Sequence, residues 1–151
     1  MIKELNTKDC LNILKNNYLG HLGYICNGIP YVVPITYYYD QENNCLVSYS
    51  SEGYKIKAMR KRRTVSLQVE EIDSIHEWKS VLVHASFEEL FQIDAKYELH
   101  EFAKGIKSII EKKENYKPSS IGEFSTKLHG GGVPVVYRLK IGEVTGRKRE
   151  E

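Results

Sequence analysis

The chain has 151 residues, with 22 Lys and Arg against 20 Asp and Glu and a formal net charge of +2 at pH 7. This length suits one domain with a sizeable core, so we expect a single domain over 1–151. The balanced charge argues against nucleic acid and membrane surfaces as partners. We find no signal peptide or transmembrane run. Three widely spaced cysteines without metal-ligand spacing predict free thiols in a cytoplasmic protein that lacks a metal site.

The first half of the chain is predicted to contain one helix and three strands. We expect a helix capped by Thr7 and ended by Gly20, because apolar residues recur between them at helical spacing. β-Branched and aromatic residues then predict strands over 21–26, 29–39 and 45–49. The Asn-Gly pair between the first two strands is a strong hairpin signal.

The second half is predicted to add two helices and three strands. In order, we expect a short helix after Gly53, strands over 64–69 and 78–91 with a polar connection between them, a helix over 94–113, a loop over 114–132, and a last strand over 133–144 followed by a basic tail. Most strands follow one another without a crossover helix. The pattern therefore predicts a mainly β (β+α) fold, an antiparallel barrel decorated by helices.

The stretch from Val47 to Val69 contains the strongest candidate for a binding site. A helix start presents free backbone N–H groups and the positive end of the helix dipole, which together attract an anion. Ser50 and Ser51 add hydroxyls, Gly53 allows close approach of the backbone, and Lys55 stands at the mouth of the helix. These residues predict a phosphate cradle. The alternative is an ordinary helix cap followed by a solvated lysine.

A basic run follows in the same helix and its exit. We expect it to form a solvated face whose cations complement the negative end of the helix dipole. The alternative is that it adds positive charge near the phosphate. The run comprises Lys57, Arg60, Lys61, Arg62 and Arg63.

Pro34 is unusual in the strand predicted over 29–39. Proline cannot donate to a sheet ladder, so it is found at edges and bulges. Its presence implies a place where strand pairing lapses and backbone groups are free to bind a flat heteroaromatic ligand. The alternative is a plain edge strand.

Two other kinds of site can be weighed from the histidines. His129 precedes three glycines, as in the oxyanion-hole loop of esterases, but the chain has no G-x-S-x-G element to supply a nucleophile, so we reject acyl transfer. The five histidines lack the paired spacing of a zinc site.

Five segments occur in an order and spacing that resemble a known superfamily. They are Gly28–Ile35 (GIPYVVPI), Tyr49–Lys55 (YSSEGYK), Val65–Leu67 (VSL), Trp78–Val81 (WKSV) and Val144–Arg147 (VTGR). The chain resembles the pyridoxamine 5′-phosphate oxidase-like proteins with the FMN-binding split barrel. Within them it is most similar to the small flavoproteins of the nitroimidazole-resistance (Nim-type) group. The resemblance runs from about Asn6 to Gly146.

This resemblance implies an antiparallel split β-barrel of the FMN-binding type, with FMN as the cofactor. In the family, one strand lies along the isoalloxazine ring and contacts its polar edge through backbone groups. The matching residues here are Val33, Pro34 and Ile35. The positions that hold the FMN phosphate match Ser50, Ser51 and Lys55, in agreement with the cradle predicted from the helix start.

The resemblance also implies a homodimer with two FMN sites at its interface. Trp78 and Ser80 match a W-x-S-V element that approaches the cofactor from the other subunit. Trp78 could instead be a core or interface aromatic. From the residues alone, Gln68 is a polar residue on the face opposite Val65, Leu67 and Val69, from which it could reach the polar edge of the flavin.

The function implied is an FMN-dependent oxidoreductase acting on a small-molecule substrate, for which no catalytic acid or base is named. Several nitroimidazole-resistance proteins carry a histidine before the phosphate lysine, where this chain has Tyr54, which weakens a claim to nitro-group reduction. One alternative is a non-catalytic flavin or haem binder, with His21 or His129 as a haem ligand. Another is an interaction protein that has lost its cofactor.

Overall fold

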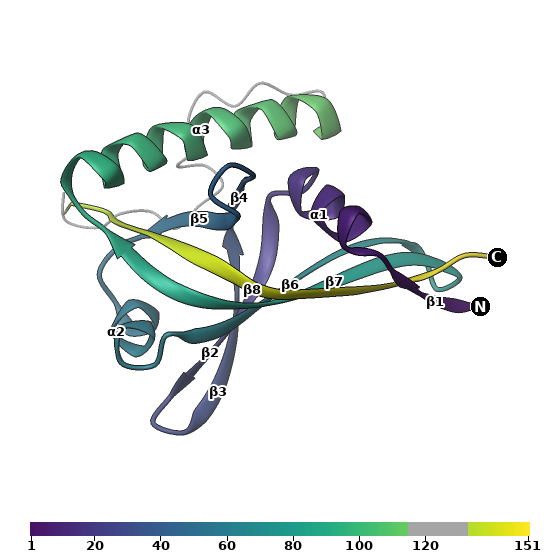
Figure 1. Cartoon of the computed structure of the whole chain (residues 1–151), viewed down its shortest axis with the longest axis horizontal. Helices are drawn as coiled ribbons and strands as arrows, with labels where there is room; N and C mark the ends of the chain where they lie inside the picture. The colour runs from purple at the N-terminus through teal and green to yellow at the C-terminus, as the bar shows by residue number, and fades with distance from the viewer. Residues whose placement is uncertain (115–132) are drawn as a thin grey trace.

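A curled antiparallel sheet organises the chain in this computed structural model, which describes residues 1–114 and 133–151 (Figure 1). The strands lie in the order β3 (Ile29–Thr36), β2 (Leu19–Cys26), β6 (Thr64–Ser74), β7 (Glu77–Leu90), β8 (Val135–Arg149), β5 (Cys45–Ser50) and β4 (Tyr38–Asp40), and β1 (Ile2–Leu5) pairs with β8. Within the described residues, no strand joins β3 to β4, and the sheet is open there. The predicted split barrel is therefore confirmed.

Three helices in the described part of the chain pack around this sheet: α1 (Thr7–Lys15), α2 (Tyr54–Lys61) and α3 (Gln92–Glu114). Figure 1 shows α3 running along one side of the sheet, with α2 apart from it beside the β2–β3 hairpin. Among the residues described, none of the helices is both long and apolar enough to cross a bilayer.

The cap of α1 lies one residue before the predicted one. The Asn6 side chain accepts a hydrogen bond from the backbone N–H of Asp9 at 2.8 Å, whereas Thr7 is already helical. The prediction of Thr7 as the cap is wrong, because Asn6 has the extended backbone and the short acceptor that the position requires.

The long strand predicted over 29–39 is interrupted at Tyr37. The Tyr37 amide donates to the carbonyl of Tyr18 at 2.8 Å, and its hydroxyl donates to the carbonyl of Leu14, also at 2.8 Å. These contacts with the end of α1 and the segment after it draw Tyr37 out of the sheet ladder, so that β3 ends at Thr36 and β4 begins at Tyr38.

Two segments predicted as irregular are strand. The polar connection expected over 70–77 is mostly the end of β6, which pairs with β7 through partners such as Glu71 and Lys79. The expected basic tail continues β8, where Arg149 lies opposite both Ile2 of β1 and Trp78 of β7. Backbone pairing between distant segments outweighs the polar composition that argued against strand.

The apolar side chains form two buried clusters. The larger lies on the concave face of the sheet and includes Leu22, Leu67, Val83 and Met59 of α2. The smaller lies under α3, where Phe102, Ile106 and Ile110 pack against β5 and β8. This second cluster holds α3 on the side of the sheet near β4.

A carboxyl group is buried where α3 meets the sheet. Glu98 is 5% exposed and lies near Asp40 of β4, which is 9% exposed. Burial, reinforced by the negative charge of Asp40, raises the pKa of Glu98 to about 6. The folded protein therefore holds this proton more tightly than the unfolded chain does.

This shift predicts a pH-dependent stability. Because the folded pKa lies above the ordinary value of 4.5, stability from this group should fall as pH rises from about 4.5 to about 6. Glu98→Gln should remove that slope and raise the free energy of unfolding at pH 7 by about 2 kcal/mol. Urea denaturation at about pH 4.5, 6 and 7 checks the slope and the gain in stability. Glu111→Gln, at an exposed residue of α3, is the control. An unchanged slope in Glu98→Gln would contradict the assignment.

Candidate functional site

The start of α2 is open to an anion. Gly53 precedes the helix with extended backbone and no side-chain cap, so the first N–H groups of the helix lack the usual capping partner. The helix is held by Ile56, Ala58 and Met59, which are buried against the barrel. Its apolar face thus fixes the direction in which its positive end points.

Lys55 adds a cation at this helix start. It is half-buried, and burial lowers the pKa of its ammonium group. Within the part of the chain that the structure describes, it has no carboxylate at ion-pair distance. A partly desolvated ammonium without a counter-ion favours an external anion. Lys55 therefore fits the phosphate role predicted for it.

The two predicted serines differ in their surroundings. Ser50, at the end of β5, is 4% exposed, and its hydroxyl donates to the carbonyl of Ser51 at 3.0 Å. Its single proton is therefore used inside the turn, and the hydroxyl must rotate before it can donate to a phosphate. Ser51 is half-buried.

The strand that carries Pro34 lies at one edge of the sheet. In residues 1–114 and 133–151, β3 pairs with β2 alone. Val33 and Ile35 pack into the core, whereas Pro34 is exposed opposite His21. The edge-strand alternative for Pro34 is thus confirmed, and the same arrangement leaves backbone groups on the outer edge of β3 available to a ligand.

Two tyrosines bring the start of α2 next to β3. The Tyr54 hydroxyl lies 3.3 Å from the Tyr31 hydroxyl, and the two rings meet edge to face at 5.6 Å. Hydrogen bonds to the Cys26 thiol and to Tyr31 raise the pKa of Tyr54, which keeps its proton at neutral pH. The helix start and the free edge of β3 therefore border one region.

Gln68 and Ser80 meet on the convex face of the sheet, which we call the outer face. The Gln68 amide donates to the Ser80 hydroxyl at 2.9 Å, and the Gln68 Oε1 atom lies 3.2 Å from Nδ1 of His21. The predicted orientation of Gln68, away from Val65 and Leu67, is confirmed by burial of the two apolar residues.

Trp78 borders a groove on the same face. The groove has a volume of about 510 Å³ and is lined by Trp78, Ser80, Leu82, Thr145 and Arg147, with Glu4 of β1 nearby. Trp78 lies opposite Arg149 and Ile72 in the sheet register. The alternative of Trp78 as a buried core residue is wrong, because its side chain is only half-buried.

The structure therefore sorts the predicted site residues into two groups. The cradle group contains Ser50, Ser51 and Lys55, and Tyr54 beside Lys55 contacts Tyr31 of β3. The outer-face group contains Pro34, Gln68, Trp78 and Ser80, because antiparallel partners point to the same face. Val33 and Ile35 belong to neither group, because their side chains pack into the core.

Sequence reasoning missed part of the outer-face group. His21, considered only as a haem ligand, contacts Gln68 and lies 3.5 Å from Glu70. These contacts depend on the register between β2 and β6, which no local signal specifies. The other haem candidate, His129, lies outside the described residues.

The sequence that forms this arrangement matches a family model. The model described as pyridoxamine 5′-phosphate oxidase matches residues 6–148, nearly the whole chain. The chain belongs to this family. The resemblance noted from the five sequence segments is thereby confirmed, and both residue groups lie within the matched range.

Individual relatives agree with the family match. Uncharacterized protein RA0666 of Rhizobium meliloti is 30% identical over 147 residues, which cover 97% of this chain and 94% of that protein. A FAD-binding protein of Mesorhizobium loti is 29% identical, with 99% of each chain covered and a TM-score of 0.73. A candidate 5-nitroimidazole antibiotic resistance protein of Bacteroides thetaiotaomicron shares the fold at 16% identity, with 98% and 89% covered and a TM-score of 0.65.

Proposed function

We propose that this chain is an FMN-binding oxidoreductase that acts on a small molecule, with its cofactor held at a homodimer interface. The observation that carries the proposal is Lys55, a half-buried cation without an ion-pair partner in the described chain, at an uncapped helix start beside the free edge of β3. The FAD-binding relative from Mesorhizobium loti supports a flavin as the ligand.

Each part of the site matches one part of the flavin. The backbone N–H groups at the start of α2 and the Lys55 ammonium would hold the phosphate. Free backbone groups along Val33, Pro34 and Ile35 would pair with the polar edge of the ring. Gln68, held by Ser80 and His21, offers a fixed amide on the outer face, where Trp78 offers a flat aromatic surface.

The protein's contribution is to bind and orient. A bound flavin supplies the capacity to accept and return electrons, and the surrounding side chains fix its position and exclude water. Lys55 and the helix dipole would stabilise negative charge at the phosphate, and the amide of Gln68 would offer a hydrogen-bond donor near the ring. No side chain is assigned as a catalytic acid or base.

We favour FMN over FAD, although both carry a phosphate on the ribityl chain. Within the described residues Lys55 has no ion-pair partner, whereas Arg60, in the last turn of the same helix, is bonded to two carboxylates. We take Lys55, at the helix start, as the cation for a single terminal phosphate. Titration with FMN and with FAD separates the two, and tighter binding of FAD would overturn the choice.

The function is tested by absorption spectra of the purified protein. FMN is added first, then a nicotinamide reductant, then an electron acceptor. Flavin bands that bleach and return support the oxidoreductase. Bound flavin without turnover indicates the non-catalytic carrier or sensor, a Soret band indicates haem, and a protein that ignores FMN refutes the proposal.

The phosphate assignment predicts the effect of one substitution. Lys55→Ala should weaken FMN binding by about 10- to 100-fold, because a charge-assisted bond to the phosphate is lost. Riboflavin, which has no phosphate, should bind both proteins equally. Flavin fluorescence titration measures both affinities, and Lys57→Ala, an exposed lysine of the same helix, is the control. Unchanged FMN affinity in Lys55→Ala would remove the assignment.

The outer face supports the proposed homodimer. It exposes apolar side chains from several strands, among them Val32 at 70%, Ile72 at 68% and Leu82 at 37%. Large apolar side chains exposed on one face of a sheet are typical of interaction sites. Because Gln68, Trp78 and Ser80 lie on the same face, a second copy packed here would place its own Trp78 near the first cofactor.

Leu82→Arg should therefore convert the dimer into a monomer and weaken FMN binding in the same protein, because a charge would be buried in the interface. Light scattering after size-exclusion chromatography measures the mass, and fluorescence titration measures the affinity. Ile93→Arg, at a residue of α3 that is 79% exposed, is the matched control. A Leu82→Arg protein that remains a dimer with full FMN affinity would place the interface elsewhere.

A further inference from the structure

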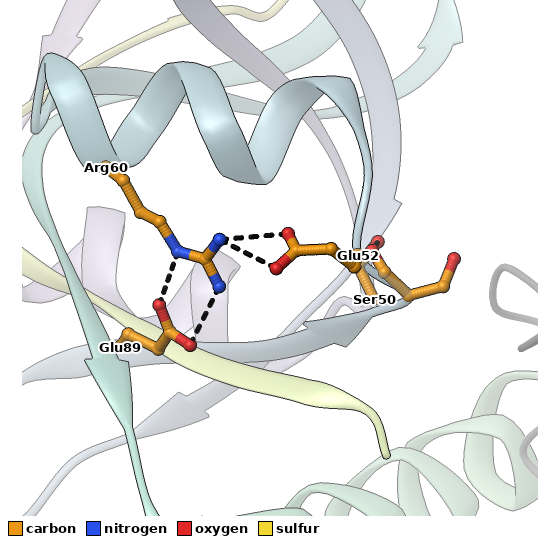
Figure 2. Close-up of polar contacts among 5 residues, drawn as sticks. Ser50, Glu52, Arg60 and Glu89 are labelled. Atoms are coloured by element: carbon orange, nitrogen blue, oxygen red, sulfur yellow. Dashed lines mark hydrogen bonds and ion pairs between the residues drawn. The ribbon is translucent and has the colours of Figure 1, made fainter. Parts of the chain in front are cut away.

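Arg60 of α2 connects the turn before the helix to a distant strand. Its Nη1 atom donates to both carboxylate oxygens of Glu52, at 2.7 and 3.0 Å. Its Nε and Nη2 atoms donate to the two oxygens of Glu89 on β7, at 2.7 and 3.0 Å. Figure 2 shows the guanidinium lying between the two carboxylates. Arg60 is exposed, as predicted, and it is also paired on both sides, which the sequence did not indicate.

These contacts leave little of Arg60 for a ligand. Every nitrogen of its guanidinium donates to a carboxylate, and both ion pairs raise the pKa of the group further, with Glu89 the stronger partner. Arg60 is thus a poor direct phosphate ligand, although it belongs to the helix that carries Lys55. Its influence on the cradle has to pass through the residues that it holds.

Glu52 is the residue through which Arg60 can act. It lies between Ser51 and Gly53 in the cradle turn, so its Cα atom is about 3.8 Å from that of each neighbour. A free carboxylate at that position would repel a phosphate, because the two charges would lie well within a Debye length of about 8 Å. In Figure 2 the Glu52 carboxylate is turned toward Arg60, and two ordinary hydrogen bonds hold it there.

We propose that Arg60 is a positioning residue of the phosphate cradle, which draws the Glu52 carboxylate away and offsets its charge so that the turn accepts a phosphorylated flavin. Through Glu89 it also fixes the turn relative to β7. This inference rests on the proposed function. It assigns to Arg60 a selective effect on the phosphate-bearing ligand, which a general contribution to folding would not produce.

The test compares two ligands that differ in one phosphate. Arg60→Met keeps the length of the side chain and frees Glu52. It should lower FMN affinity about tenfold while changing riboflavin affinity little, because repulsion acts on the phosphate alone. Adding Glu52→Gln to Arg60→Met should restore most of the FMN affinity. Lys61→Met removes a cation of the same helix that has no ion-pair partner among the described residues, and it should leave the ratio of the two affinities unchanged.

Salt provides a second readout. The FMN deficit of Arg60→Met should shrink as ionic strength rises, because salt screens the repulsion between Glu52 and the phosphate. Should Arg60→Met not fold, Arg60→Lys is the second variant, because a single ammonium group cannot form paired hydrogen bonds with both carboxylates. It should show a smaller loss of FMN affinity, again with little change in riboflavin affinity.

The outcomes are distinguishable. Equal losses for FMN and riboflavin, or a deficit that Glu52→Gln does not relieve, would show a merely structural role and overturn the proposal. An equal effect of Lys61→Met would show that only overall charge matters, and would also overturn it. A wild-type chain that binds no FMN would instead refute the proposed function.

Discussion

The alternation of side chains along β6, β7 and β8 is the constraint on which the rest of the molecule depends. On these long strands one set of residues fills the barrel and the other set forms the outer face. Val81 and Val83 are fully buried, while Ser80 and Leu82, which alternate with them, face outward. A slip of one residue in the register would exchange the two sets. The core and the outer-face group are therefore specified together.

The short helix α2 shows how one element can give two cations opposite environments. Lys55, in its first turn, is half-buried and lacks an ion pair in the described structure, whereas Arg60, one and a half turns later, binds two carboxylates. The apolar residues between them, Ile56 and Met59, anchor the helix in the core. Packing thus sets the orientation of the helix, and that orientation decides which cation remains available.

Local patterns in the sequence were sufficient for the fold class and for the turn and helix start at which the candidate cradle lies. The hairpin at Asn27-Gly28, the alternation after Thr64 and the hydroxyl-rich turn before Lys55 each reflect short-range chemistry, and each is present in the structure as a turn, a strand or a helix start. Such signals extend over a few residues and do not depend on the rest of the chain.

The features that were missed all depend on contacts between distant segments. The extension of β8 to Arg149 needs β1 and β7 as partners, and the break at Tyr37 needs the carbonyl groups of Leu14 and Tyr18. Arg60 on α2 and Glu89 on β7 are 29 residues apart in the chain, and no spacing rule predicts that they pair. Local composition could not indicate these contacts, and the tertiary partners decided the outcome in each place.

The position of Trp78 has a consequence for how this protein can be followed in solution. It is the only tryptophan in the chain, and it lies half-buried on the outer face, away from both apolar clusters. Its fluorescence emission therefore reports whether that face is exposed to solvent or covered. Unfolding of the two apolar clusters has to be followed by another signal, such as far-ultraviolet circular dichroism or the absorption of the buried tyrosines.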